Sequence, residues 1–222
     1  MTAVDSPKPL QRVIEQEGDT AAFLPYPPIG DELEHVPMAV RPDVFYYLSR
    51  MGFLPNTIKL YLHVPWVAEQ LFRLNNAIMR DERNGLSEHL KYRLSIIASR
   101  DNDCEYCTAH HVAILKGRWG YAESAVEQIL QMEHGQDERE RVAVEFVHRA
   151  SLDPTTVPGE LRRRLAELFS PQEVMEIVFV VGFWKMYNTM HSAMAAPLED
   201  PVSQYAGWVH VQPAAEPRDP RP

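Results

Sequence analysis

The sequence predicts an all-α protein, a single-domain helical bundle flanked by irregular, proline-rich arms. Between residues 43 and 199, apolar side chains recur at helical spacing, and no stretch shows the sustained apolar–polar alternation that indicates strands. Seven of the 18 prolines lie in residues 1–42 and six in residues 197–222. Because proline does not fit the interior of a helix or of a central strand, we expect irregular arms at 1–42 and 200–222.

The two arms differ in their apolar content. Residues 1–20 favour disorder, whereas residues 197–211 carry apolar side chains that favour packing. These side chains belong to Tyr205, Trp208, Val209 and Val211.

Four helices are expected in the first half of the helical domain. They span residues 43–51, 56–62 and 65–80, and a stretch in which Leu86, Leu90, Leu94 and Ile97 mark one face. Pro65 falls near the first turn of the third helix, where proline fits well. Ser87 is the expected N-cap of the fourth.

Five more helices are expected in the second half, at residues 102–116, 123–132, 137–150, 158–168 and 171–195. Gly117 and Gly120 bound the end of the first of these. Ser170 is the expected N-cap of the last, which has Pro171 at its first position.

Charge and composition exclude several classes of function. The formal net charge is −9 and no run of Lys or Arg is longer than the three arginines at 162–164, which disfavours nucleic acid and anionic membranes as partners. The N-terminus lacks the pattern of a secretory signal, and the longest apolar run, Ile177–Trp184, is far short of the ~20 residues that span a bilayer. We therefore expect a cytoplasmic protein. No phosphate-binding loop or nucleotide fingerprint is present, so no organic cofactor is expected.

The chain has two cysteines, Cys104 and Cys107. Stable structural disulfides are unusual in the cytosol, so a CxxC pair there indicates redox chemistry or metal binding. The short polar residues at 101–103 favour a helix start. With Asn102 as the N-cap, Glu105 takes the third helical position, as in a capping box. Cys104 then lies in the first turn, where the helix N-terminus lowers a thiol pKa.

His111 lies four residues after Cys107 and shares its helix face. It can take a proton from a thiol or give one to a leaving group. A thiolate attacks an oxidant, a sulfenic acid forms, and the other cysteine condenses with it to a disulfide. The helix N-terminus favours Cys104 as the thiol of lowest pKa, whereas the neighbouring histidine favours Cys107 as the attacking thiol.

Two plainer interpretations of the cysteines stay open. One is a buried pair that only packs, because free cysteine is a common core residue. The other is zinc, but the adjacent His110 and His111 cannot easily close a tetrahedron with both thiolates, so no metal is expected. His110 is interpreted as a packing or hydrogen-bonding residue. The other histidines are interpreted as surface or satisfied core residues, namely His35, His63, His89, His134, His148, His191 and His210.

The pattern resembles the alkylhydroperoxidase D-like branch of the carboxymuconolactone decarboxylase superfamily over residues 43–199. The likeness is carried by Gly-Leu-Ser-Glu-His-Leu at 85–90, Cys-x-x-Cys-x-x-x-His at 104–111, Lys-Gly at 116–117 and Met-Tyr-Asn at 186–188. The resemblance implies an all-α homo-oligomer (dimer, trimer or hexamer) that reduces organic hydroperoxides or hydrogen peroxide. It implies that Cys107 attacks the peroxide and that Cys104 resolves.

The sequence departs from the family at two positions. Family members place a glutamate twelve residues before the first cysteine and can carry a histidine before the second, where this chain has Tyr92 and Tyr106. The family's proton relay is therefore reduced to His111, aided by one of these hydroxyls. Glu88, one turn before Tyr92, is the first choice for a replacement carboxylate. The other choices are Glu69 and Glu105.

The sequence thus predicts a thiol-dependent, peroxidase-like oxidoreductase with a reducing partner protein or small thiol. A redox-sensing or binding module with little turnover is one alternative, and a non-redox, decarboxylase-like enzyme with His111 as its base is another. Aromatic side chains that could line an apolar pocket, or simply form core, are Trp66, Tyr92, Tyr106, Phe183, Trp184 and Tyr187.

Overall fold

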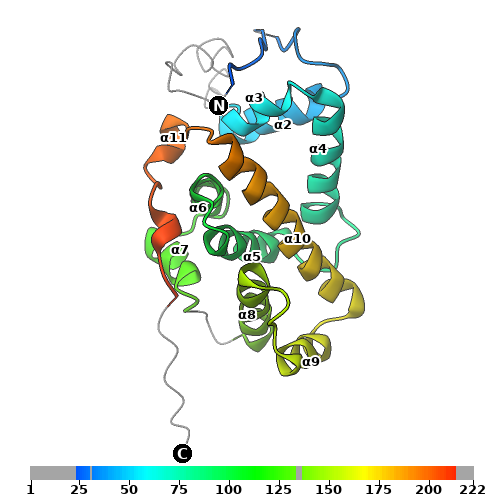
Figure 1. Cartoon of the computed structure of the whole chain (residues 1–222), viewed down its shortest axis with the longest axis vertical. Coiled ribbons are helices and arrows are strands. Elements are labelled where there is room, and N and C mark those ends of the chain that lie inside the picture. Colours follow the sequence, from blue (N-terminus) through cyan, green and yellow to red (C-terminus); the bar gives the residue numbers. More distant parts are fainter. Residues whose placement is uncertain (1–23, 31, 134–136, 214–222) are drawn as a thin grey trace, which may run out of the picture. The chain divides into compact units, whose positions relative to one another are not determined.

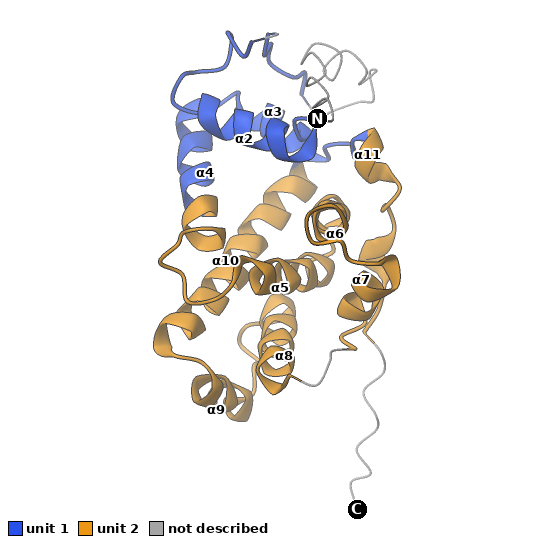
Figure 2. Ribbon diagram, turned by 180° about the vertical axis from the view of Figure 1, so that it is seen from behind, with its two compact units in different colours: residues 1–74, 194–199 blue, residues 75–193, 200–222 orange. Residues whose placement is uncertain are grey.

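The computed structural model describes residues 24–30, 32–133 and 137–213. Across these ranges the chain forms helices and connecting loops and no β-strand, which confirms the predicted all-α fold (Figure 1). The disorder favoured for residues 1–20 concerns positions outside the described residues. The chain divides into two compact units, residues 1–74 with 194–199 and residues 75–193 with 200–222 (Figure 2).

The first unit contains α2 (Arg41–Met51), α3 (Asn56–Tyr61) and α4 (Pro65–Met79) as far as Leu74. Its core consists of buried aliphatic side chains and Phe72. Helix α3 has no side-chain cap of its own, because Pro55 occupies the N-cap position. Glu199 supplies the missing acceptor, since its carboxylate accepts the backbone N–H of Asn56. A carboxylate at a helix N-terminus is stabilising because it meets unpaired N–H groups and the positive end of the helix dipole.

The second unit is built around α5 (Glu88–Asp101), which packs against helices on several sides. Its neighbours are α6 (Glu105–Trp119), α7 (Glu123–Leu130), α8 (Glu138–Leu152) and the 3-10 helix η1 (Trp208–His210). The other helices of this unit are α9 (Gly159–Leu168), α10 (Pro171–Met194, as far as Ala193) and α11 (Asp200–Ser203). Leu94, Ile96 and Ile97 of α5 have no exposed surface. The sequence predicted one apolar face on α5, whereas in the structure side chains around most of the helix are buried.

A buried ion pair fixes the loop that leads into α5. Lys91 is fully buried, and its Nζ lies 2.9 Å from Glu176 Oε2 and donates to the carbonyl of Ile78 at 2.7 Å. The Glu176 carboxylate also accepts the backbone N–H groups of Gly85 and Leu86, at 2.7 and 3.0 Å. Buried charges require this kind of pairing. Glu176 therefore ties α10 to the start of α5.

The predicted helices are present, with differences at their ends. Ser87 caps α5 as predicted, because its side chain accepts the N–H of Leu90. The prediction of Asn102 as the N-cap of α6 is wrong. Asn102 instead ends α5, Asp103 adopts a positive φ of 54°, and Cys104 is the N-cap. The left-handed turn at Asp103 moves the helix start by two residues.

The C-terminal end of α6 also lies later than predicted. Gly117 is inside the helix, and Gly120 ends it in the left-handed conformation with φ 68°. The expected irregular C-terminal arm contains α11 and η1, which pack against α6 through the buried Val202 and Val209. Among the described residues, no helix is long and apolar enough to cross a membrane.

Candidate active site

The two cysteines lie together at the start of α6, and no disulfide joins them. Cys104 is 1% exposed and Cys107 is 2% exposed. The Sγ atom of Cys104 accepts the backbone N–H of Cys107 at 3.3 Å, so this sulfur itself caps the helix. In place of the Ser, Thr, Asp or Asn oxygen that usually fills this position, α6 uses a thiol.

The surroundings separate the pKa values of the two thiols. Hydrogen bonds from the Cys107 thiol and backbone and from the Ser192 hydroxyl lower the pKa of Cys104, against burial and the nearby Asp103. Burial raises the pKa of Cys107 well above that of an ordinary thiol, and the adjacent Cys104 sulfur raises it further. Cys104 is therefore the thiol that ionises first, in agreement with its place at the helix N-terminus.

His191 is the imidazole that contacts the dithiol. Its Nδ1 atom lies 3.2 Å from Cys107 Sγ, within hydrogen-bond distance for sulfur. His191 is a buried core residue with a hydrogen-bond partner, as the sequence allowed, but the sequence did not place it beside the dithiol. A signal was present in the sequence, because polar groups recur on the buried face of α10 at Tyr187, Asn188 and His191. Periodicity alone does not show which element this face contacts.

His111 lies on the same helix as the cysteines but contacts a different partner. It is fully enclosed, and burial followed by the charges of His110 and His191 lowers its pKa to about 3. Its Nδ1 atom lies 3.3 Å from the Ser99 hydroxyl of α5, and that hydroxyl donates to Asn188 Oδ1 at 3.2 Å. His111 is thus uncharged near neutral pH and forms part of a polar chain that links three helices.

The structure also locates the three residues predicted to assist His111. The Tyr92 ring packs edge-on against His111, with 5.9 Å between ring centroids. Tyr106 stacks on His110 at 4.2 Å and meets His191 edge-on at 5.5 Å. Glu88 instead forms an ion pair with Arg118.

The other two carboxylates considered from the sequence have partners of their own. Glu105 accepts the backbone N–H of Gly207 at 2.9 Å. Glu69 pairs with Arg73 at 2.6 Å and belongs to the first unit. Polar contacts to the dithiol come from His191 and Ser192, which the sequence did not single out.

Aromatic rings surround the cluster. Trp184 packs edge-on against His111 with ring centroids 4.3 Å apart, and the Tyr187 ring lies tilted against Phe183 with ring centroids 4.2 Å apart. The indole Nε1 of Trp184 is buried and, within the described part of the chain, has no hydrogen-bond partner. Of the aromatic residues considered for a pocket, Trp66 belongs to the first unit and is 69% exposed.

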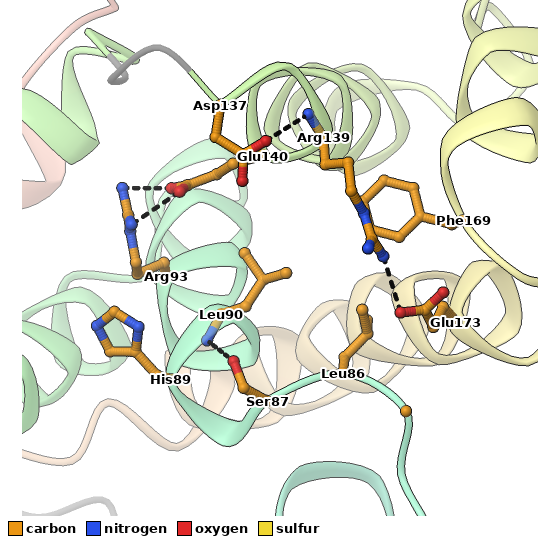
Figure 3. Close-up of a pocket in the computed structure, with 11 residues that line it drawn as sticks. Leu86, Ser87, His89, Leu90, Arg93, Asp137, Arg139, Glu140, Phe169 and Glu173 are labelled. Carbon is orange, nitrogen blue, oxygen red and sulfur yellow. Dashed lines mark hydrogen bonds and ion pairs between the residues drawn. The ribbon is translucent and has the colours of Figure 1, made fainter.

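A pocket of about 320 Å³ lies elsewhere in the second unit, at the N-terminal ends of α5, α8 and α10 (Figure 3). None of the cysteines or of His111 and His191 lines it. Four of its charged side chains form two ion pairs, Arg93 with Glu140 and Arg139 with Glu173. Asp137 also lines the pocket and accepts the backbone N–H of Arg139.

Comparisons with known proteins point to one fold. No protein-family profile matches the chain. It is 25% identical to the uncharacterized protein YnjA of Escherichia coli (strain K12) over 169 residues, which are 75% of this chain and 92% of YnjA. The alkylhydroperoxidase AhpD core protein from Ralstonia eutropha JMP134, an uncharacterized peroxidase-related protein, has a TM-score of 0.72 and 20% identity over 83% of this chain and 96% of its own.

Two further solved structures agree. A peroxidase-related protein from Silicibacter sp. TM1040 has a TM-score of 0.71 and 21% identity, covering 84% of this chain and 96% of its own. The debrominase Bmp8 has a TM-score of 0.68 and 22% identity, covering 78% and 92%. The chain therefore has the alkylhydroperoxidase D-like fold that these peroxidase-related proteins share.

Proposed function

We propose that the chain is a thiol-dependent oxidoreductase that reduces hydroperoxides through a dithiol–disulfide cycle of Cys104 and Cys107. The observation that carries the proposal is the free thiol pair at the start of α6, with Cys107 Sγ 3.2 Å from His191 Nδ1. The fold shared with peroxidase-related proteins supports the same class of chemistry.

In the proposed cycle Cys104 is the nucleophile. Its lowered pKa makes it the thiolate of the pair, and a thiolate is the reactive form of cysteine. The Cys104 sulfur attacks one peroxide oxygen, so that the S–O bond forms while the O–O bond breaks. The sulfur loses two electrons to the peroxide. The products are a Cys104 sulfenate and an alcohol, or water from hydrogen peroxide, because the departing oxygen takes up the proton that the attacked oxygen carried. This assignment reverses the roles implied by the family resemblance.

Cys107 then resolves the sulfenate. Its raised pKa keeps it protonated until a base removes the proton, and His191 Nδ1 is at the distance for that transfer. The Cys107 sulfur attacks the Cys104 sulfur, the S–S bond forms and the S–O bond breaks. The proton held by His191 goes to the departing oxygen, which leaves as hydroxide. A protein dithiol or small thiol returns two electrons and two protons by thiol–disulfide exchange.

The surroundings favour an apolar hydroperoxide. Trp184, Tyr187 and Tyr92 give the cluster aromatic walls, and the Trp184 N–H is a buried donor that the described residues leave unpaired. Buried donors without partners are rare in folded proteins, so such a group is a candidate for binding a ligand. We propose that it donates a hydrogen bond to a peroxide oxygen.

The test is to oxidise the fully reduced protein with cumene hydroperoxide or hydrogen peroxide and to follow the loss of two hydrogens by mass spectrometry. Cys107→Ser is expected to accumulate a dimedone-trapped sulfenate at Cys104. Cys104→Ser is expected to form no sulfenate. Oxidation of the wild type no faster than that of free cysteine would reject the peroxidase. A sulfenate that forms at Cys107 in Cys104→Ser would reverse the two roles.

A redox sensor is the second candidate, and one contact favours it. Glu105, which lies between the two cysteines, holds the backbone N–H of Gly207. The segment that follows α10 is therefore anchored on the CxxC turn itself. If disulfide formation changes this turn, the C-terminal segment reports the redox state. Slow turnover together with a redox-dependent change in residues 200–211 would favour the sensor.

A further inference from the structure

The polar chain behind His111 determines where the proton of that ring lies. Asn188 Nδ2 donates to the carbonyl of Ala98 at 3.3 Å. This contact orients the amide so that Asn188 Oδ1 faces Ser99. The Ser99 hydroxyl lies 3.2 Å from that oxygen. Because an amide oxygen only accepts hydrogen bonds, the Ser99 proton points toward Asn188.

Ser99 then has no second proton to give. A serine hydroxyl carries one donor hydrogen and two acceptor lone pairs. His111 Nδ1, 3.3 Å from the same oxygen, can form a hydrogen bond only by donating its own N–H. In an uncharged imidazole one nitrogen carries the proton and the other is an acceptor. The proton at Nδ1 therefore leaves Nε2 as the basic nitrogen.

We infer that Asn188 and Ser99 are positioning residues that hold His111 in the Nδ1–H tautomer, which leaves its Nε2 atom unprotonated. This tautomer does not depend on the proposed function. All three side chains are buried, with Ser99 0%, Asn188 1% and His111 2% exposed, so water does not compete for these hydrogen bonds. Tautomers set by such a second partner decide which nitrogen reacts.

The hydrogen-bonded side chains Asn188 and Ser99 also take the place of the carboxylate that the sequence left unassigned. The glutamate that the family resemblance led us to expect is replaced by Tyr92, and Glu88 is occupied by Arg118. An uncharged amide and hydroxyl instead orient the ring from α10 and α5. They fix the tautomer without adding a charge that would stabilise the imidazolium.

The test uses long-range ¹H–¹⁵N correlation spectra of the histidine rings in the reduced, ¹⁵N-labelled protein at pH 7. Wild type is expected to show His111 with a protonated Nδ1. In Asn188→Leu the Ser99 proton is free to turn toward Nδ1, so the Nε2–H tautomer is expected to dominate. Ser99→Ala removes the Ser99 acceptor and leaves the hydrogen bond between the His111 ring and the Cys107 backbone, so the Nδ1–H signal is expected to weaken. A wild-type spectrum with the proton on Nε2 would overturn the inference.

Ser95→Ala is the matched control. Ser95 is also buried on α5, and its hydroxyl donates to the Lys91 carbonyl at 2.7 Å, outside the His111 chain. This variant is expected to keep the wild-type tautomer, in contrast to Ser99→Ala. An unchanged His111 spectrum in Ser99→Ala would overturn the inference, even if Asn188→Leu fails to fold. A wild-type protein that shows the Nδ1–H tautomer but does not react with peroxide would reject the proposed function alone.

Discussion

The Nδ1 atom of His191 lies 3.2 Å from the Sγ atom of Cys107, although 84 residues separate the two along the chain. Helix α10 thus supplies the imidazole that faces the thiol of α6. This contact places an imidazole nitrogen beside the thiol of higher pKa, while hydrogen bonds lower the pKa of Cys104.

His191→Gln is expected to separate the two chemical steps. The amide keeps polar bulk but cannot take a proton from Cys107 near neutral pH. Sulfenate formation at Cys104 should proceed near the wild-type rate, whereas disulfide closure should slow by about a hundredfold, within the usual range for loss of a general base. Rapid quenching with dimedone followed by mass spectrometry measures both steps. His210→Gln, at an exposed position, is the control. Equal closure rates in the two variants would remove His191 from the mechanism.

The buried His111 should make the fold sensitive to acid. Its pKa is about 3 in the folded state and about 6.5 in an unfolded chain, so the unfolded state binds the proton more readily as the pH falls. The stabilisation is present above pH 6.5 and is lost between pH 6.5 and 3, at about 1.4 kcal/mol per unit. In urea unfolding at pH 7 and pH 4, wild type should lose more stability than His111→Gln. A parallel loss in both proteins would contradict this assignment.

Removing one partner of the Lys91–Glu176 pair should be costly. Lys91→Met leaves a carboxylate that is 9% exposed without its cation, and a loss of about 3 kcal/mol is expected. The double variant Lys91→Met/Glu176→Gln should lose less than the sum of the single variants, because no uncompensated charge remains. Chemical denaturation of the four proteins gives the coupling energy. Additive losses would mean that the pair does not act as a unit.

Trp184→Phe tests the unpaired indole N–H. The variant keeps an aromatic ring against His111 but has no donor. The rate constant for oxidation by cumene hydroperoxide should fall by about tenfold, which corresponds to the loss of about one hydrogen bond. Reaction with a small alkylating reagent should stay the same, because it does not use the donor. A rate equal to that of wild type with both reagents would show that Trp184 only packs.

Glu105→Ala should release the C-terminal segment. The change removes the acceptor of the Gly207 N–H, and residues 200–211 should exchange amide hydrogen faster while the exchange of α5 stays unchanged. Hydrogen exchange read by mass spectrometry resolves the two regions. Glu127→Ala, at an exposed position on α7, is the matched control. If residues 200–211 exchange equally in all three proteins, Glu105 does not hold the segment.

Much of the fold could be predicted from the sequence because its signals are local. Apolar spacing located helices α2 to α10, and Ser87 marked the start of α5 with the hydrogen bond that the structure contains. The start of α6 could not be predicted in the same way. Three consecutive polar residues predicted an N-cap at Asn102. Asp103 adopts the left-handed conformation instead, and Cys104 is the N-cap.

The residues of the candidate site also divide into those with a local sequence signal and those without one. Cys104 and Cys107 follow from their spacing, and the helix dipole indicated the thiol of lower pKa. His191 and Ser99 act through contacts between α5, α6 and α10, which no local pattern encodes. Glu88 was predicted to replace the family's glutamate because it lies one turn from Tyr92. In the structure its carboxylate instead forms an ion pair with Arg118 on α6.

The sulfur of Cys104 caps α6 and, in the proposed cycle, is also the atom that gives up electrons. The hydrogen bonds that hold the start of the helix favour the thiolate, and they therefore favour the reduced form of the pair over the disulfide. Stabilising the reduced form raises the reduction potential of a dithiol. A fold that begins a helix with a cysteine thus makes its disulfide easy to reduce, and the pair is returned readily to the state in which it can meet the next oxidant.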